Sequence, residues 1–237
     1  MAHHFHSHHK GASQWIKKYL LEFSKLNNLS FWTSDLAIFD HRALEADIVF
    51  WGNSNYELAA NDMCGTHFVR NPVNLIISAY YSHLKTHPVE PGWCKLDVQR
   101  KLLNSVSHDQ GLALTVSFLE RNDFGFRTPG PLHALRNWDF SDERFTNLRI
   151  EDLFNNPRLI LQAYSNLSNM ILPSDNDFTF EAMSGGRQPG EIDENSHYRS
   201  GDVKNWKTHH SEFLKHYVSL WLPQLTNRFY PELLVRE

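Results

Sequence analysis

The stretch His6-Ser-His-His-Lys-Gly-Ala-Ser-Gln-Trp-Ile16 decides how this chain folds. Its first residues suit a short strand, which leads into a turn at residues 10–12. Ser13 is a favoured N-cap residue, and it opens a helix that we expect over residues 13–26. The helix is indicated by apolar residues at helical spacing, which are Trp15, Ile16, Tyr19, Leu20 and Phe23.

A strand, a turn of small residues and a helix N-terminus in succession are typical of an anion-binding site. Backbone N–H groups point out of the first helical turn, the helix dipole adds partial positive charge, and glycine lets the backbone approach an anion closely. Lys10 adds a full, mobile positive charge. The stretch therefore predicts a site for a phosphate-like anion beside Lys10.

Short apolar segments alternate with helical ones along the rest of the chain. Strands of this kind, separated by helices, predict a parallel sheet. A long loop rich in Asn, Gly, Pro and Arg is expected at residues 121–143, and a basic loop with several glycines at 184–207. The further strands are expected at 30–33, 47–51, 66–69 and 147–150, and the further helices at 73–85, in two pieces within 96–119, at 157–172 and at 211–222.

The composition excludes several classes of protein. A chain of 237 residues, 41% of them hydrophobic, fits one domain spanning 1–237. A net charge of −4 disfavours a non-specific nucleic-acid binder, and no apolar run reaches the roughly 18 residues that a membrane span needs. The two cysteines, Cys64 and Cys94, are too few for a disulfide framework, so we expect a cytoplasmic protein.

Histidines crowd the N-terminus. Alternation along a strand places His4, His6 and His8 on one face. They are interpreted either as a metal site or as the polar edge of a sheet. No carboxylate or cysteine lies close in the sequence to complete a metal site, so we expect no metal here.

Five motifs occur in order over nearly the whole chain. Lys10-Gly-Ala-Ser-Gln-Trp15 is similar to a phosphosulfate loop, Lys-Ser-Gly-Thr-Thr-Trp. Arg70-Asn71-Pro72, with Ser78 eight residues after the arginine, is similar to a 3′-phosphate element. The chain as a whole resembles the sulfotransferases that use 3′-phosphoadenosine 5′-phosphosulfate (PAPS). The other three motifs are Arg149-Ile-Glu-Asp-Leu153, Thr179-Phe-Glu-Ala-Met183 and Arg199-Ser-Gly-Asp-Val-Lys-Asn-Trp-Lys207.

The resemblance implies a fold and a reaction. The fold is α/β and P-loop-like, with three layers: a central parallel sheet flanked by helices, and the nucleotide at the C-terminal strand ends. The reaction moves a sulfuryl group from PAPS to a hydroxyl or amine of a small-molecule, lipid or carbohydrate acceptor. It leaves 3′-phosphoadenosine 5′-phosphate (PAP).

The resemblance also implies roles for individual residues. Lys10 is implied to be catalytic, because its ammonium follows the bridging oxygen as that oxygen becomes anionic. Arg70 suits a phosphate because its planar fork binds two oxygens. Arg187 is a further candidate for the same pocket. The residues implied to bind the nucleotide are Lys10, Gly11, Ala12, Ser13, Gln14, Trp15, Arg70, Ser78, Phe180, Arg199, Ser200 and Gly201.

The chain departs from the family's motifs at several positions. Gly11-Ala12 replace Ser-Gly, which shifts the tightest position of the turn, and Gln14 replaces Thr. Ser200 replaces Lys, which removes one positive charge from the 3′-phosphate site. Ile150 stands where a tyrosine often reaches the adenine.

The general base has no clear counterpart in this chain, since the family's usual histidine before the Arg-Asn-Pro strand is missing. A base must come within hydrogen-bond reach of the acceptor. The candidates are His41, Glu57, His83 and His108, and His41 is preferred because it precedes the central strand. No metal is implied, since the order Gly-x-x-x-x-Gly-Lys-Ser/Thr is absent.

Two other functions stay open. The altered first loop and the missing histidine are compatible with a non-catalytic nucleotide-binding protein that keeps the fold. A nucleotide-phosphate kinase is disfavoured, because Lys10 precedes the small residues and no magnesium-binding Ser or Thr follows them.

Overall fold

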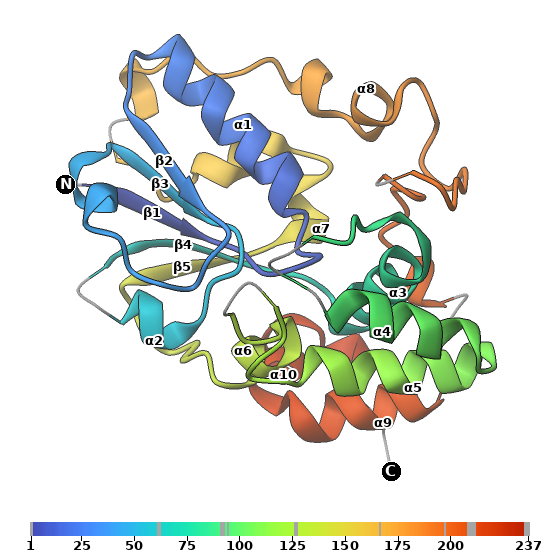
Figure 1. Ribbon diagram of the computed structural model, residues 1–237. Coiled ribbons are helices and arrows are strands. Elements are labelled where there is room, and N and C mark those ends of the chain that lie inside the picture. The colour runs from blue at the N-terminus through green and yellow to red at the C-terminus, as the bar shows by residue number, and fades with distance from the viewer. Residues whose placement is uncertain are drawn as a thin grey trace.

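The computed structural model describes residues 2–60, 63–90, 93, 95–125, 128–165, 167–196, 198–207 and 212–234. Cys94 and the expected helix start at Ser211 lie outside these residues. In the described part of the chain, five strands pair in parallel in the order β2-β3-β1-β4-β5 (Figure 1). They confirm the expected strands to within about two residues: β1 (His3–His6), β2 (Phe31–Ser34), β3 (Ile48–Trp51), β4 (Gly65–Val69) and β5 (Phe145–Arg149).

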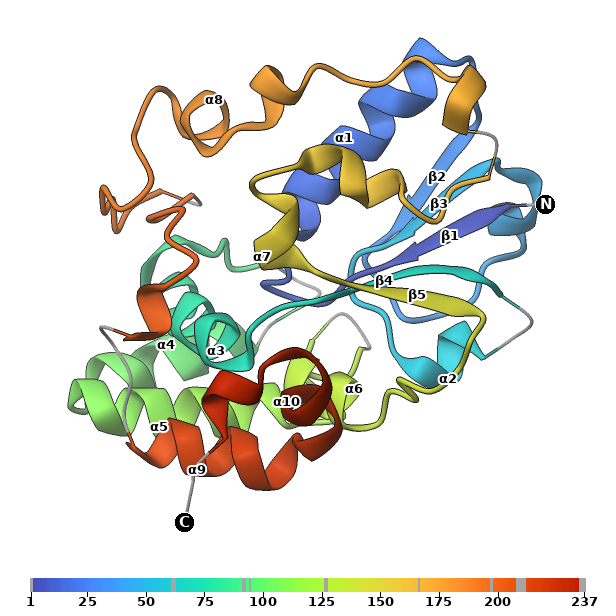
Figure 2. The ribbon, with the colours of Figure 1, turned by 180° about the vertical axis from the view of Figure 1, so that it is seen from behind.

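Helices cover both faces of the sheet. On one face, Phe5, Phe50 and Phe68 pack with α1 (Ser13–Leu26) and with parts of the chain between residues 150 and 178. On the other face, Val49 and Trp51 belong to a core shared with α3 (Pro72–Tyr81), α5 (His108–Leu119), α6 (Pro131–Arg136), α9 (Glu212–Trp221) and α10 (Pro223–Phe229). Figure 2 shows the same arrangement from behind. The expected α/β fold, a central parallel sheet flanked by helices, is confirmed.

The remaining elements are short or lie at the rim. None of the helices in the described ranges is both long and apolar enough to cross a bilayer. The other α-helices are α2 (Tyr56–Ala59), α4 (Lys95–Asn104), α7 (Ile150–Leu153) and α8 (Phe180–Ser184), and 3₁₀ turns include His41–Glu45, Pro157–Leu161, Leu167–Asn169, Asp175–Phe178 and Asn205–Lys207.

Helix α1 has the predicted bounds, but its N-cap is Ala12, so the prediction of Ser13 as the cap is wrong. Ala12 has φ 55°, in the left-handed region, and no side chain caps the helix. The first N–H groups of an α-helix have no carbonyl partner four residues back within the helix, and in α1 the N–H of Trp15 donates instead to the carbonyl oxygen of Ala12 at 3.0 Å. Their orientation at the end of the loop is therefore suited to an external anion.

Two predictions of helix and loop are wrong in part. The expected loop 121–143 contains α6, because Gly130 and Pro131 start a helix that buries Leu132 and Leu135. Where the structure describes the expected helix 157–172, it has two 3₁₀ turns and no α-helix, since Ser and Asn in this segment have low helix propensity. The helix expected at 73–85 is α3 followed by a π-helical turn at Ser82–Thr86.

The N-terminal histidines lie in the interior of the sheet, so their interpretation as a sheet edge is wrong. His6 donates to or accepts from Ser54 Oγ at 2.8 Å. His8 Nε2 lies 2.8 Å from His67 Nε2, and His67 Nδ1 lies 2.7 Å from Asn147 Oδ1. Burial lowers the pKa of His4 and His8 to about 4, and the pKa of His6 and His67 well below the usual value.

Candidate functional site

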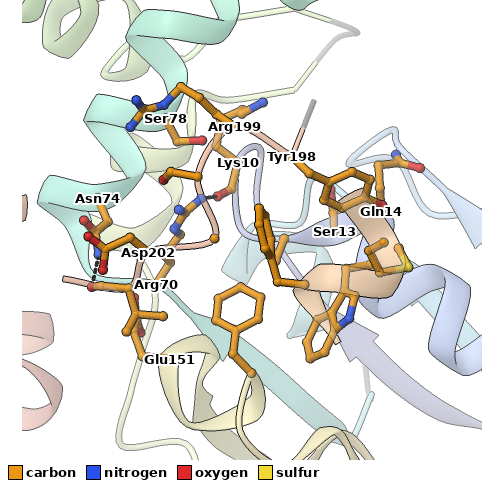
Figure 3. A pocket seen from close by; sticks show the side chains of 18 of the residues that line it. Lys10, Ser13, Gln14, Arg70, Asn74, Ser78, Glu151, Tyr198, Arg199 and Asp202 are labelled. Carbon is orange, nitrogen blue, oxygen red and sulfur yellow. Dashed lines mark hydrogen bonds between the residues drawn. The ribbon is translucent and has the colours of Figure 1, made fainter. Parts of the chain in front are cut away.

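Several segments far apart in the sequence line one cavity at the C-terminal ends of β1 and β4. They include the loop after β1, Arg70 after β4 with one face of α3, parts of the chain between residues 151 and 183, and residues 198–203. Figure 3 shows Lys10 and Arg70 between Ser78 and Arg199 on one side and Glu151 on the other. The cavity is lined by His9, Lys10, Ala12, Ser13, Gln14, Trp15, Arg70, Asn74, Ser78, His87, Glu151, Phe154, Phe178, Phe180, Met183, Tyr198, Arg199, Ser200, Gly201, Asp202 and Val203.

The loop after β1 is tightly folded. Lys10 has φ 61° and Ala12 has φ 55°, two left-handed residues on either side of Gly11. A Cβ on Gly11 would lie 2.8 Å from the carbonyl oxygen of His8, so the loop closes only around a glycine. Left-handed residues in a short loop turn successive N–H groups toward one side, which suits an anion.

Lys10 carries its charge in a poorly hydrated place. Its Nζ donates to Ser82 Oγ at 3.0 Å, from the turn that follows α3. Burial, with the nearby Arg70 guanidinium, lowers the pKa of Lys10 to about 7. Near neutral pH the lysine therefore populates both its charged and its neutral form. An anion in the cavity would favour the charged form.

Arg70 ends β4 and points back to the first loop. Its Nη1 donates to the carbonyl oxygen of Lys10 at 2.5 Å. Asn71 then caps α3 by accepting from the N–H groups of Val73 and Asn74, and Pro72 occupies the first turn as predicted. This cap fixes where the arginine leaves the strand and where the α3 face that carries Ser78 begins.

Glu151 is the acidic partner behind Arg70. Its carboxylate accepts from the Asn71 N–H at 2.9 Å and from the Tyr230 hydroxyl at 2.8 Å. Burial lowers the pKa of Arg70, and the charge of Glu151 opposes that shift. Since the carboxylate is held by two donors, Arg70 keeps further donor groups for a ligand.

Residues 198–203 close the cavity and are held from two sides. Asn74 Nδ2 donates to the Val203 carbonyl at 2.7 Å, and Asn74 Oδ1 accepts from the Trp206 N–H at 2.8 Å. Arg187 donates to the carbonyls of Tyr198 and Arg199 at 2.6 and 3.1 Å. Arg187 therefore braces this segment, and it is not among the residues that line the cavity.

The same segment places a cation and a glycine toward the cavity. The Arg199 guanidinium lies over the ring of Tyr81, with its carbon 4.3 Å from the ring centroid. Gly201 has φ +58°, and a Cβ there would lie 2.4 Å from the ring of Phe180. The aromatic ring of Phe180 thus rests against the glycine at the rim of the cavity.

Aromatic side chains form the wall opposite the cations. Trp15 Nε1 donates to the Phe178 carbonyl at 2.8 Å, and its ring lies 5.1 Å from that of Phe154. Trp15 is both a core residue and part of the cavity wall. With Phe180 and Met183 nearby, this end of the cavity suits a flat, apolar group.

The comparisons with known proteins address the fold. The solved structures include a similar one, mouse sulfotransferase SULT7A1 in complex with PAP, with a TM-score of 0.61 and 12% sequence identity. The match covers 97% of this chain and 87% of the mouse chain. The chain has the sulfotransferase fold. No family model matches the sequence, and no curated protein is similar to it in sequence.

In this sulfotransferase fold, most of the predicted site residues come together. Gly11 is an exception, because it closes the loop from beneath and does not line the cavity. The residues that do line it are Lys10, Ala12, Ser13, Gln14, Trp15, Arg70, Ser78, Phe180, Arg199, Ser200 and Gly201. Their roles stay predictions, but their proximity is a feature of the structure.

The candidate bases are placed differently from expectation. His41 lies on an exposed 3₁₀ turn and is not among the residues that line the cavity. Glu57 on α2 and His108 on α5 are also absent from the cavity lining. His83 is fully buried, with its Nε2 3.0 Å from His9 Nε2.

Several lining residues were not singled out from the sequence. Asn74 lies four residues after Arg70 and four before Ser78, so the helical spacing that joins those two also selects Asn74. Glu151 belongs to the Arg149–Leu153 motif. Asp202 belongs to the Arg199–Lys207 motif. His9 and His87 carry no local signal of this cavity, because their position there depends on contacts between distant segments.

Proposed function

We propose that this protein is a sulfotransferase that moves a sulfuryl group from PAPS to a hydroxyl or amine of an acceptor. The observation that carries the proposal is the meeting of Lys10, Arg70 and Arg199 in one cavity. Three cations from three distant segments suit a ligand with several anionic groups, and a doubly phosphorylated adenosine is such a ligand. The fold shared with a sulfotransferase supports the same reading.

In this proposal, each part of the donor has its own group of residues in the cavity. The loop at residues 10–14, with its uncapped helix start, suits the 5′-phosphosulfate. Arg70, Ser78 and Arg199 suit the 3′-phosphate, and the wall of Trp15 and Phe180 suits the adenine. Because Ser200 stands where the family has Lys, the 3′-phosphate would contact one positive charge fewer than in the family.

Lys10 carries the chemical step in this proposal. The sulfuryl transfer has a loose transition state in which negative charge gathers on the bridging oxygen of the departing nucleotide. The Lys10 ammonium, which donates to Ser82 Oγ, would exchange this hydroxyl for that oxygen. A preorganised cation at the place where charge develops lowers the barrier most.

The proposal is tested by binding and by transfer. We expect PAP to raise the thermal unfolding temperature more than ADP does, since only PAP carries the 3′-phosphate. We expect transfer of labelled sulfate from PAPS to members of a panel of phenols, steroids, lipids and sugars. The Lys10→Ala variant should lose about a hundredfold or more in rate, while Lys25→Ala, on the exposed far end of α1, serves as the matched control.

Each alternative has its own outcome. Stabilisation by PAP without transfer to any acceptor would support a non-catalytic nucleotide-binding protein. Stabilisation by ATP that depends on magnesium would support a nucleotide-phosphate kinase.

A further inference from the structure

His87 lines the same cavity as Lys10 and His9. It follows directly on the π-helical turn Ser82–Thr86, which supplies the hydroxyl of Ser82 to Lys10. One short segment of chain therefore positions both the lysine and a histidine beside it. His87 was not a candidate from the sequence.

The tautomer of His87 is set by its backbone neighbour. Its Nδ1 lies 2.9 Å from the carbonyl oxygen of Pro88. A carbonyl oxygen only accepts, so Nδ1 carries the hydrogen, and in the neutral ring Nε2 then carries the lone pair. Within the described part of the chain, Nε2 has no hydrogen-bond partner.

The ring and backbone of His87 are both held in place. The ring packs edge-on against Trp93, with centroids 4.8 Å apart, and lies 5.4 Å from the ring of His9. Arg100 donates to the carbonyl of His87 at 2.6 Å and to that of His83 at 2.8 Å. A group fixed in this way meets the requirement for a positioned base.

We infer that His87 is the general base that takes the proton from the acceptor. This inference rests on the proposed function. The other nearby histidines are less suited, because His9 Nε2 is engaged with His83 Nε2 and His83 does not line the cavity.

The lone pair of the acceptor oxygen or nitrogen forms a bond to sulfur while the bond from sulfur to the bridging phosphate oxygen breaks. The acceptor's proton moves to His87 Nε2, and the electron pair of the broken bond stays on the departing nucleotide, opposite Lys10. His87 is then an imidazolium, and it returns its proton to water.

The charges around His87 keep it neutral at neutral pH. Burial is the main cause that lowers its pKa, and the positive charges of Lys10 and Arg100 act in the same direction. The Pro88 carbonyl and Glu90 oppose the shift. His9 and His83, whose rings face it, complete the titratable groups around the ring.

The test compares transfer with binding in one variant. His87→Asn keeps a side-chain donor for the Pro88 carbonyl and removes the base. We expect its kcat to fall by about a hundredfold to ten-thousandfold, while its affinity for PAP stays unchanged. The decline of the wild-type kcat at acid pH should disappear in the variant, and added imidazole should restore part of the rate. His216→Asn, on the exposed side of α9, is the matched control.

The outcomes separate this inference from the proposed function. If Lys10→Ala abolishes transfer but His87→Asn does not slow it, the inference is overturned and the sulfotransferase proposal stands. If His87→Asn loses PAP binding as well, its role is structural and the inference is overturned. If the wild-type chain neither binds PAP nor transfers sulfate, both fail.

Discussion

The Arg70 guanidinium donates to the carbonyl oxygen of Lys10 across 2.5 Å, which ties the end of β4 to the loop after β1. Two of the cations that line the cavity, Lys10 and Arg70, are thus positioned by a single contact between the ends of neighbouring strands. Any ligand that binds both meets a pair whose spacing is fixed before it arrives. Arg70 therefore lines the cavity and also holds the loop that carries Lys10.

Replacing Arg70 by Gln tests its part in binding the 3′-phosphate. A hydrogen bond to a charged group contributes about 1.5–3 kcal/mol, so we expect PAP affinity to fall by about ten- to a hundredfold. Adenosine 5′-phosphate, which lacks the 3′-phosphate, should lose much less. Titration calorimetry with both nucleotides measures the difference. Equal losses for the two would assign Arg70 to the loop alone, and Arg42→Gln, on an exposed turn, is the control.

Replacing Asn74 by Ala tests the hold on residues 198–203. The variant leaves the Val203 carbonyl and the Trp206 N–H without their partner. Each such bond contributes about 1 kcal/mol, so we expect weaker PAP binding with a small loss in the free energy of unfolding. Calorimetry and urea unfolding measure the two effects. The control is Asn137→Ala, which removes an exposed asparagine whose side chain donates to the His133 carbonyl in its own turn. The prediction would be contradicted if Asn74→Ala bound PAP as tightly as the wild type does.

Replacing Gly201 by Ala tests the position of Phe180. The added methyl would lie 2.4 Å from the ring, so the ring must move. Stacking on an aromatic ring contributes about 1–3 kcal/mol per base, and we expect PAP affinity to fall within the matching range of about five- to a hundredfold. Gly190→Ala is matched in backbone strain, with φ +101° and open space around it. Equal PAP affinity in the two variants would show that Phe180 does not hold the adenine.

The pKa of Lys10 predicts uptake of a proton on binding. Because this pKa is about 7 in the free protein, much of the lysine is neutral at pH 8. A bound anion favours the charged form, so binding at pH 8 should take up a proton, and affinity should weaken as pH rises above 7. Calorimetry in buffers with different heats of ionisation measures the uptake. The wild type should exceed Lys10→Met by up to one proton, and no difference between them would contradict the assignment.

The buried histidines predict loss of stability in acid. In the folded protein the pKa is about 4 for His4 and His8 and well below the usual 6.5 for His6 and His67, so the unfolded chain binds more protons than the folded chain once the pH falls below 6.5. The contribution of these histidines to the free energy of unfolding should therefore be largest above about pH 6.5 and should decline as the pH falls toward 4. Each histidine contributes a slope of about 1.4 kcal/mol per pH unit. Urea unfolding at several pH values measures it. His67→Gln should flatten the slope by about one proton, whereas the exposed His216→Gln should not.

Much of the fold follows from local patterns. The apolar spacing of α1 and the apolar composition of β3 reflect burial against the sheet, which acts within a few residues. Strand β1 is harder to interpret, since its histidines are polar and their partners Ser54, Trp51 and His67 are distant in the sequence. Helix α6 was missed because Gly130 and Pro131, which start it, also mark loops.

The candidate site also combines residues that local motifs indicate with residues whose position depends on distant contacts. Arg70 and Ser78 are joined by a helical spacing, and Lys10 stands in a loop with its own signature. The carboxyl ends of parallel strands then bring these loops to one edge. His87 could not be found from the sequence, because its nearness to Lys10 is decided by the path of the chain after α3, which no motif encodes. His41 lies on a turn before β3 that is not part of the cavity lining.

The central place of β1 has a consequence for how the chain reaches its native state. Strand β1 pairs with β3 and β4, whose partner residues follow about 45 and 61 positions later in the sequence. Its hydrogen bonds cannot form until those segments exist, so the sheet must be completed late and from its middle. Topologies with such distant pairings fold slowly. Loss of the few residues of β1 would divide the sheet in two.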